Sequence, residues 1–238
     1  MELISAYAPH PIKRPVMLQT WRALTFLHWA YEPAVIRRLL PEGVELDTFN
    51  GAAWIGLTPF LLANLHPPLM PAVPWLSSFP EMNVRTYVKG RDGKPGIWFF
   101  TLEADRMAAV LGARMSYRLP YRWARMRVRE QEGIVSYQSD RFAPFGKGRA
   151  RIAVRPGARM EAGQFDNFLT ARYRLYTRAG KRIGHADIEH EPWPLRSADV
   201  VQFEQDVVEH SGVPKPDGNP VVHFSHEVQV RIGWRRWE

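Results

Sequence analysis

Polar side chains alternate along one short stretch of the chain at Glu81, Asn83, Arg85 and Tyr87. A period of two is typical of a β-strand, so the four side chains are expected on one face of a strand. A carboxyl, an amide, a guanidinium and a phenol together can hold a carboxylate or carbonyl ligand and move a proton. The same alternation is typical of a solvated outer face, and the pattern alone favours that interpretation.

A second group of candidate ligand-binding or catalytic residues follows at Arg114, Tyr117, Tyr121 and Arg122. The planar guanidinium of Arg114 matches the geometry of a carboxylate. The hydroxyl of Tyr121 could polarise a carbonyl oxygen or exchange a proton if its pKa fell. The structural alternative makes Tyr121 a core aromatic at a strand bend. It places Arg114 in an internal ion pair with Glu81 or Glu103.

The histidines give no metal site. His185, Asp187 and Glu189 are metal-ligand types on one strand face, but alternating polar residues are found on any outer face. His28 lies between apolar neighbours and is expected to be a core histidine. His223 and His226 fall on opposite faces of a strand. The chain also lacks cysteine and the glycine-rich motifs of nucleotide sites, so we predict no metal and no cofactor.

Alternating apolar residues predict a mainly β (α+β) fold. Strands are expected around residues 83–88, 97–102, 124–129, 149–155, 171–176 and 222–234. Short helices are expected at 32–40, 107–111 and 164–169, and a longer one at 197–210, where Ser197 could cap an apolar stripe. No linker or repeat divides the chain, so residues 1–238 are interpreted as one domain. We expect a curved antiparallel sheet that closes into a barrel or clamshell around an internal pocket.

The net charge of +8 raises the question of an acidic partner. Because the arginines are spread along the whole chain without a recognition motif, we do not expect nucleic acid as a partner. Prolines and basic residues interrupt the first fifteen residues, so a signal peptide is not expected. No apolar stretch is long enough to span a bilayer, and a cytoplasmic location is expected.

All lysines lie in turn-like sequence, which predicts hydrated ammonium groups on the surface. They are Lys13, Lys89, Lys94, Lys147, Lys181 and Lys215. A catalytic amine needs burial or a cationic neighbour to lose its proton near neutrality. The sequence therefore offers no lysine that is placed for covalent chemistry on a carbonyl.

Many phrases of the chain resemble the bacterial YqjF-like family of uncharacterised proteins, which is related to the acetoacetate decarboxylase superfamily. They include Leu27-His-Trp29, Leu39-Leu-Pro-Glu-Gly43, Asn83-Val-Arg-Thr-Tyr87, Leu119-Pro-Tyr121 and Pro192-Trp-Pro-Leu195. The match runs from about residue 19 to about residue 234. It implies a β-rich clamshell with an internal cavity, but it supplies no reaction. Relatives of the decarboxylase type form larger assemblies, so a homo-oligomer stays open.

The segment 112–122 also resembles the segment around the Schiff-base lysine of acetoacetate decarboxylases. Arg114, Tyr117 and Pro120 fall on the arginine, aromatic and proline of that family, and Tyr121 falls on the reactive lysine. A phenol cannot form an imine with a carbonyl. The resemblance also places Glu81 at a pocket glutamate, which shifts the interpretation of its strand face from solvent to pocket.

These observations together predict a protein that holds a small acidic or carbonyl metabolite in an internal pocket. If the protein is an enzyme, its chemistry on a keto or carboxylic acid is independent of an imine. Arg85 or Arg114 would then hold the anion, Glu81 would act as acid or base, and Tyr121 would polarise the carbonyl. The alternatives are a ligand-binding or sensor module and, as the least favoured, a basic protein associated with nucleic acid.

Overall fold

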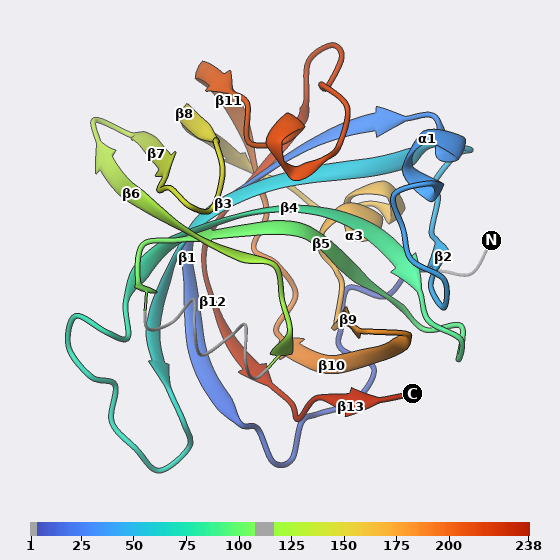
Figure 1. Cartoon of the computed structure of the whole chain (residues 1–238). Helices are drawn as coiled ribbons and strands as arrows, with labels where there is room; N and C mark the ends of the chain where they lie inside the picture. The colour runs from blue at the N-terminus through green and yellow to red at the C-terminus, as the bar shows by residue number, and fades with distance from the viewer. Residues whose placement is uncertain (1–3, 108–116) are drawn as a thin grey trace.

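The computed structural model describes residues 4–107 and 117–238. Within these ranges the chain folds mostly into strands (Figure 1). In chain order the elements are β1 (Met17–Tyr31), α1 (Pro33–Arg37), β2 (Glu45–Leu46), β3 (Ala53–His66), β4 (Phe79–Lys89), β5 (Pro95–Ala104), β6 (Tyr121–Gln131), β7 (Ile134–Arg141), β8 (Arg149–Arg159), α3 (Gln164–Thr170), β9 (Arg174–Ala179), β10 (Arg182–His190), β11 (Arg196–Gln205), a 3-10 turn η1 (Glu209–Ser211), β12 (Val221–Ile232) and β13 (Arg236–Trp237).

The strands form one sheet that closes on itself twice. Their order is β13-β10-β9-β5-β6-β7-β8-β11-β12-β1-β3-β4-β2, and β10 also pairs with β12 while β5 also pairs with β4. We call the closed path β5-β6-β7-β8-β11-β12-β1-β3-β4 the large ring, and the closed path β4-β5-β9-β10-β12-β1-β3 the small ring. Both share the central strands β12, β1, β3, β4 and β5. The prediction of a curved, largely antiparallel sheet that closes into a barrel is confirmed.

Two central strands divide their pairing between the rings. The early part of β5 pairs in parallel with β9, and its last residues pair in parallel with β6, where Leu102 lies opposite Tyr121. Likewise β12 pairs with β11 at Phe224 and with β10 at Ile232. Figure 1 accordingly shows β9 and β10 below the central strands, and β6, β7, β8 and β11 at the upper left and top.

Among the central strands, β3 and β4 are buried on both faces over most of their length, because each face lines a different ring. On β4, Met82 and Val84 pack into the core of the large ring with residues such as Ile152 and Tyr137. The opposite face of β4 carries the polar series that begins at Glu81. Strands of a sheet that is covered on both sides are expected to read as nearly continuous apolar runs. The polar face of β4 departs from that expectation and marks the interior of the small ring.

The expected strands are present, and the expected short helices at 32–40 and 164–169 correspond to α1 and α3. The first residues expected for the strand at 171–176 precede β9, which begins at Arg174. The helix expected at 107–111 falls largely outside the described residues. α3 begins where the carboxylate of Asp166 accepts a hydrogen bond from the Gly163 amide at 2.8 Å.

The long helix predicted at 197–210 is wrong, because that segment forms β11 followed by the turn η1. β11 pairs with β8 over nearly its whole length, and this pairing overrides the weak helical pattern. The Phe203 ring packs 5.5 Å from that of Trp29, whereas Val200 and Val201 are exposed. A register break between Val200 and Gln202 shifts the alternation, which is why the apolar spacing looked helical.

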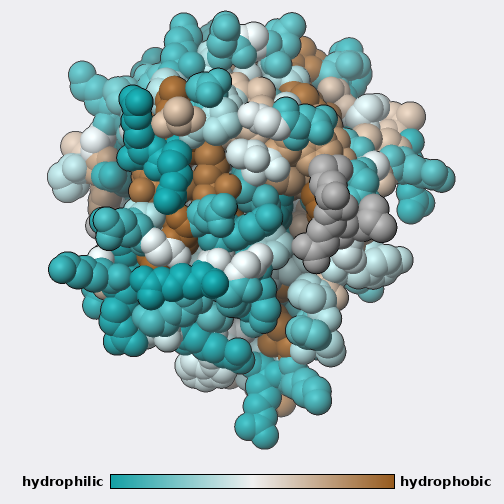
Figure 2. Space-filling view, turned by 90° about the vertical axis from the view of Figure 1, so that its right-hand side faces the viewer, coloured by the Kyte–Doolittle hydropathy of each residue, from teal (hydrophilic) through white to brown (hydrophobic). Residues whose placement is uncertain are grey.

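Figure 2 shows one face of the molecule on which hydrophilic residues dominate and hydrophobic ones are visible only in small areas between them. Within the described ranges, no helix is long and apolar enough to cross a membrane.

Candidate functional site

The polar face of β4 is buried inside the small ring. Glu81 and Asn83 are each 4% exposed, Arg85 is 6% exposed and Tyr87 is fully buried. The solvated outer face that the alternation alone favours is therefore wrong, and the interior position is confirmed. Alternation shows only that the two faces of a strand have different environments. It could not show that the polar face of β4 lies inside the small ring and not in solvent.

Tyr121 contacts Glu81 although β5 lies between their strands. Its hydroxyl donates a hydrogen bond to Oε2 of Glu81 at 2.8 Å. Tyr121 is the first residue of β6, and the parallel pairing with β5 places it next to Leu102, one strand away from β4. The sequence analysis named both residues as site candidates, but it did not predict their contact, which joins positions 40 residues apart.

Both members of the pair have shifted protonation equilibria. Burial raises the pKa of Glu81 to about 7, although the hydrogen bond from Tyr121 opposes the shift. Burial, with the charge of Glu81 and the hydrogen bond to it, raises the pKa of Tyr121 well above that of a free phenol. Glu81 can thus gain or lose a proton near neutrality, and Tyr121 remains a hydrogen-bond donor.

Arg85 is held between aromatic rings on the same face. Its guanidinium lies 5.1 Å from the centroid of Phe26 and 5.9 Å from that of Tyr87. Nη2 donates a hydrogen bond to the carbonyl of Leu169 at 3.4 Å. Nε is buried and has no hydrogen-bond partner among the described residues. The guanidinium is therefore fixed in place while one of its donors stays unsatisfied.

Unsatisfied polar atoms also occur beside Arg85. Thr58 lies directly opposite Asn83 in the antiparallel pairing of β3 with β4, so both side chains project from the same face. The Oγ1 of Thr58 and the Oδ1 of Asn83 are buried without hydrogen-bond partners in the described parts of the chain. Buried polar atoms are normally satisfied, because leaving one unpaired costs about 1–3 kcal/mol.

A chain of hydrogen bonds ends at the Leu169 carbonyl, which also accepts from Arg85. The His28 ring nitrogen Nε2 lies 2.6 Å from the Tyr87 hydroxyl, which donates to the carbonyl of Leu169. Burial, with the charge of Arg85, lowers the pKa of His28 well below its usual value, so the ring is neutral. A Cβ at Gly56 would lie 2.9 Å from Nε2 of His28 and 3.4 Å from Cγ of Arg85. The absence of a side chain at Gly56 gives these two residues their room.

A buried ion pair between Arg172 and Asp47 packs against the other side of this group, at Tyr87 and Phe168. Arg172 donates hydrogen bonds to Asp47 at 2.8 Å and to the carbonyl of Phe168 at 2.8 Å. Its guanidinium also lies 4.8 Å from the centroid of the Tyr87 ring. Sequence reasoning missed Arg172 and Asp47. The two residues are far apart in the chain, and no local pattern links them.

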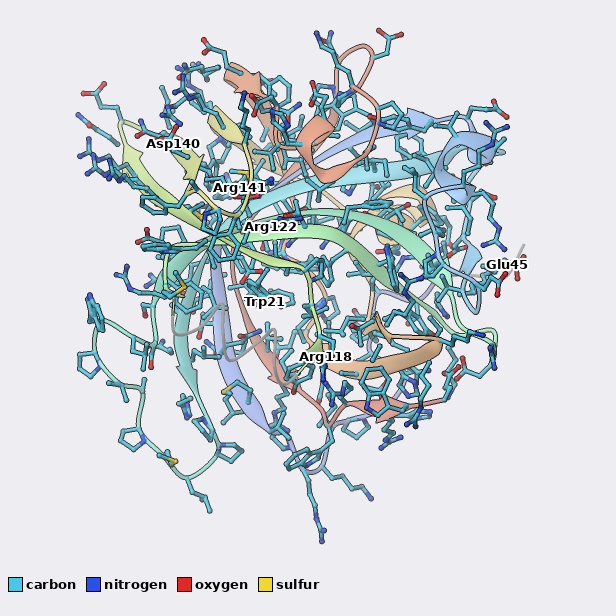
Figure 3. The ribbon with its side chains drawn as sticks, viewed as in Figure 1. Trp21, Glu45, Arg118, Arg122, Asp140 and Arg141 are labelled. Carbon is cyan, nitrogen blue, oxygen red and sulfur yellow. The ribbon has the colours of Figure 1, made fainter. Side chains whose placement is uncertain are left out.

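The other predicted site residues have different positions. Tyr117 donates a hydrogen bond to the carbonyl of Gly233 at 3.2 Å. Arg122 donates to the carbonyl of Phe145 at 3.0 Å and lies near the crossing of β6 over the central strands (Figure 3). It follows Tyr121 on the strand, so it projects from the other face. Arg114 lies outside the described residues.

A second buried acid, Glu103, belongs to the large ring. It forms an ion pair with Arg141, and both side chains are almost completely buried. The structural alternative paired Arg114 with Glu81 or Glu103, and it stays a prediction because Arg114 lies outside the described residues; among those residues Glu81 bonds Tyr121 and Glu103 bonds Arg141. Arg141 went unnoticed in the sequence because arginines recur on neighbouring strands and nothing local distinguishes this one.

The histidines and acids that were considered as metal ligands in the sequence have other partners in the structure. Asp187 pairs with Arg174, and the ring of His185 contacts the carboxylate of Glu238 at 3.2 Å. His223 is buried and bonded to Asp166, whereas His226 is exposed, as their opposite faces predicted. The described residues contain no group of three or more side chains that could hold a metal ion.

All six lysine positions lie within the described residues, and none is buried. Lys89, the least exposed, retains 44% exposure of its side chain and pairs with Asp47. The remaining ones are exposed: Lys13, Lys94, Lys147, Lys181 and Lys215. The prediction that no lysine amine lies in the interior is confirmed.

Two hollows occur in the described part of the chain. The larger has a volume of about 1090 Å³ and includes Gln19, Thr20 and His190 in its wall. The smaller has a volume of about 590 Å³ and is lined in part by Trp193 and Leu195. Neither is lined by the residues of the β4 face.

A group of aromatic rings separates these hollows from Arg85. The Trp193 ring stacks on Trp21 at 5.9 Å and meets Phe26 edge-on at 5.1 Å. Phe26 in turn lies under the guanidinium of Arg85. Figure 3 shows Trp21 between β12 and the start of β6. The hollows and the buried polar face are therefore about two aromatic rings apart.

The fold is shared with several enzymes of low sequence identity. An acetoacetate decarboxylase-like enzyme from Sphingomonas wittichii RW1 matches with a TM-score of 0.67 at 12% identity, over 94% of this chain and 93% of that one. The enduracididine biosynthesis enzyme MppR complexed with pyruvate matches with a TM-score of 0.66 at 13% identity, over 96% and 92%. Acetoacetate decarboxylase from Legionella pneumophila matches with a TM-score of 0.62 at 11% identity, over 96% and 92%. These likenesses establish an acetoacetate decarboxylase-like fold.

Sequence comparison identifies closer relatives. The chain is 39% identical over 228 residues to the uncharacterized protein YqjF of Bacillus subtilis (strain 168), and the match covers 93% of each protein. A family model with the description "Uncharacterized conserved protein" matches residues 18–229. The resemblance to YqjF-like proteins is thereby confirmed, and the chain belongs to the family DUF2071 of uncharacterized conserved proteins.

Proposed function

We propose that the interior of the small ring binds a small metabolite that carries a carboxylate or carbonyl group, without forming an imine. The observation that carries this proposal is the 2.8 Å contact of the Tyr121 hydroxyl with Glu81. It lies on the same buried face as the unsatisfied Arg85 and Asn83 atoms. A carboxylate or carbonyl oxygen of a ligand would accept a hydrogen bond from the Nε–H of Arg85, and a hydroxyl group of the ligand would donate one to Oδ1 of Asn83, which favours binding of a polar molecule.

Each group has a role that its chemistry suits. The Nε–H of Arg85 would donate to a ligand carboxylate, and Tyr121 would donate to a carbonyl oxygen once a ligand competes for its hydroxyl. The enzyme MppR, which shares the fold, has been crystallised with pyruvate, a ligand of this class. Access would require movement of Trp193 or Trp21, the rings that stand between the two hollows and Phe26.

A second candidate function is proton-transfer catalysis on the bound keto or carboxylic acid. It is favoured by the pKa of Glu81, which burial raises to about 7. A carboxyl group with that pKa is suited to act as general acid and base near neutrality. Tyr121 would stabilise negative charge that develops on the carbonyl oxygen. No step in this scheme uses a lysine.

The test measures melting temperature with pyruvate, acetoacetate and related acids. Because a ligand that binds only the native state stabilises it by about 2.7 kcal/mol at one hundred times its Kd, a bound acid should raise the melting temperature by several degrees. Tyr121→Phe should reduce this shift, whereas Glu81→Gln, which replaces the carboxyl group by an uncharged amide, should retain it. Tyr137→Phe and Glu103→Gln are matched controls in the large ring, and each should retain it.

Product analysis separates the two functions. Consumption of the acid that Glu81→Gln abolishes would support catalysis, whereas retained binding without any product would support a binding module. Borohydride added with acetoacetate should leave the protein mass unchanged. A covalent adduct on any lysine, or the absence of a melting shift with every acid, would overturn the proposal.

A further inference from the structure

Arginines form a regular row on the outer face of β6. Arg125, Arg127 and Arg129 alternate along the strand and are all exposed. Successive members are about 6.5–7 Å apart, because a strand rises by about 3.3 Å per residue. The neighbouring positions on the inner face include Ala124 and Met126, which pack in the core of the large ring. The row therefore points away from the protein.

A second row lies two strands away on β8. Arg149 and Arg155 are exposed, and Arg151 is partly exposed. In the pairing of β6, β7 and β8, Gln138 of β7 stands between Arg127 and Arg151. The two rows are thus about 10 Å apart, since adjacent strands are separated by about 4.8 Å. Between them the outer face of β7 presents hydroxyl, amide and carboxylate groups.

Positive charge on this face is only partly neutralised. Asp140 of β7 pairs with Arg149 at 3.1 Å and with Arg151 at 2.6 Å. In Figure 3, Asp140 lies on the strands at the upper left, away from the small ring. Within the described ranges, the arginines of the β6 row form no ion pair, and neither does Arg155. The nearest acids of β11 are Glu204 and Asp199, opposite Arg151 and Arg155, so they lie beyond the β8 row.

Aromatic rings adjoin one end of the β6 row. The guanidinium of Arg125 lies 5.5 Å from the centroid of the Phe142 ring, and Phe142 packs 4.2 Å from Trp123. Both rings are partly exposed. A basic track with adjoining aromatic rings is the combination that single-stranded nucleic acids use, because phosphates pair with the cations and bases stack on the rings.

We propose that the outer face of β6, β7 and β8 binds single-stranded nucleic acid. The β6 row and the β8 row would lie on either side of one phosphate backbone, and Gln138 would face it from the middle. The chain was not expected to bind nucleic acid because its arginines are spread along the sequence. The fold gathers six of them on two strands separated by one, which the linear spacing did not reveal.

Other polyanions fit the face less well. A membrane surface is normally contacted by basic residues together with inserted apolar side chains. Large apolar side chains that are exposed occur elsewhere in the described chain, such as Leu69, Trp75 and Trp234, and are not found on these three strands. A duplex is usually read by a helix or ribbon in a groove, and the partly exposed rings could not reach its stacked bases.

The test is fluorescence anisotropy of a labelled oligothymidylate of roughly 20 nucleotides, longer than a usual single-strand footprint. Affinity is measured over a series of salt concentrations. The test variant carries Arg125→Gln, Arg127→Gln and Arg129→Gln. Each lost phosphate contact lowers the slope of log K against log salt by about 0.7, so the slope should become shallower by about 2.

A matched control removes the same charge elsewhere on the surface. It carries Arg14→Gln, Arg38→Gln and Arg91→Gln, all of which are exposed positions outside the three strands. It should keep nearly the whole slope. An equal loss in both variants, no binding at low salt, tighter binding to a duplex of the same length, or a preference for phosphatidylglycerol vesicles would each overturn the proposal. The result does not depend on the interior of the small ring.

Discussion

The hydroxyl of Tyr121 donates a hydrogen bond to Oε2 of Glu81 at 2.8 Å, inside the small ring. The two residues come from strands that are separated by β5, and the parallel pairing of β5 with β6 brings them together. The resemblance to acetoacetate decarboxylases places Tyr121 at the position of their reactive lysine. This chain has a phenol there, whose hydroxyl donates a hydrogen bond to a buried carboxyl group and cannot form an imine with a carbonyl.

Replacement of Glu81 by Gln should make stability depend less on pH. The folded pKa of about 7 lies above the usual value of 4.5, so the folded state binds this proton more tightly. The associated stability is complete below about pH 4.5 and is lost as pH rises to about 7, a total of roughly 3 kcal/mol. In urea denaturation from pH 4 to 9, the free energy of unfolding of Glu81→Gln should therefore increase relative to that of the native chain as the pH rises. A constant difference would contradict the assignment.

Replacement of Tyr121 by Phe should raise the pKa of Glu81 further. The hydrogen bond from Tyr121 stabilises the carboxylate and opposes the effect of burial. Its loss should raise the pKa by roughly one unit. Carbon-13 NMR of the glutamate carboxyl groups measures the shift directly, and Tyr137→Phe serves as the control. An unchanged pKa of Glu81 in Tyr121→Phe would show that the hydrogen bond between the two residues does not form in solution.

Replacement of Gly56 by Ala should displace the support of Arg85. The new Cβ would lie 2.9 Å from the His28 ring, closer than side-chain contacts normally allow. Overpacking of this kind costs about 1–3 kcal/mol. The control Gly163→Ala meets its nearest atom at 3.4 Å, which is ordinary contact, and should cost much less. Thermal denaturation of the two variants makes the comparison, and equal stability would contradict the packing described around His28.

Replacement of Arg141 by Met should be strongly destabilising. It leaves Glu103 buried without its cationic partner, at a cost of about 3–5 kcal/mol. A second substitution, Glu103→Leu, removes the unpaired charge and should restore most of the lost stability. Chemical denaturation of both single variants and the double variant closes the cycle. If the double variant were as unstable as Arg141→Met alone, the ion pair would not be the cause.

The sequence was sufficient for the family and for six of the strands, and it named Glu81 and Tyr121 as site candidates without predicting their contact. Alternation is a local property, and the resemblance placed Tyr121 on the position of the reactive lysine. The helix expected at 197–210 failed because pairing of β11 with β8 is a non-local interaction. Asp47 and Arg172 escaped notice for the same reason: they meet only after the small ring has closed.

The role of Glu81 and Tyr121 in ligand binding is tested most directly by calorimetric titration of acetoacetate at about pH 5.5 and about pH 8.5. An anionic ligand beside Glu81 requires that carboxyl group to be protonated, so affinity should fall by roughly thirtyfold between the two values. In Glu81→Gln the affinity should be nearly independent of pH. Binding by the native chain that is equally tight at both values, or that is unchanged in Tyr121→Phe, would contradict this role.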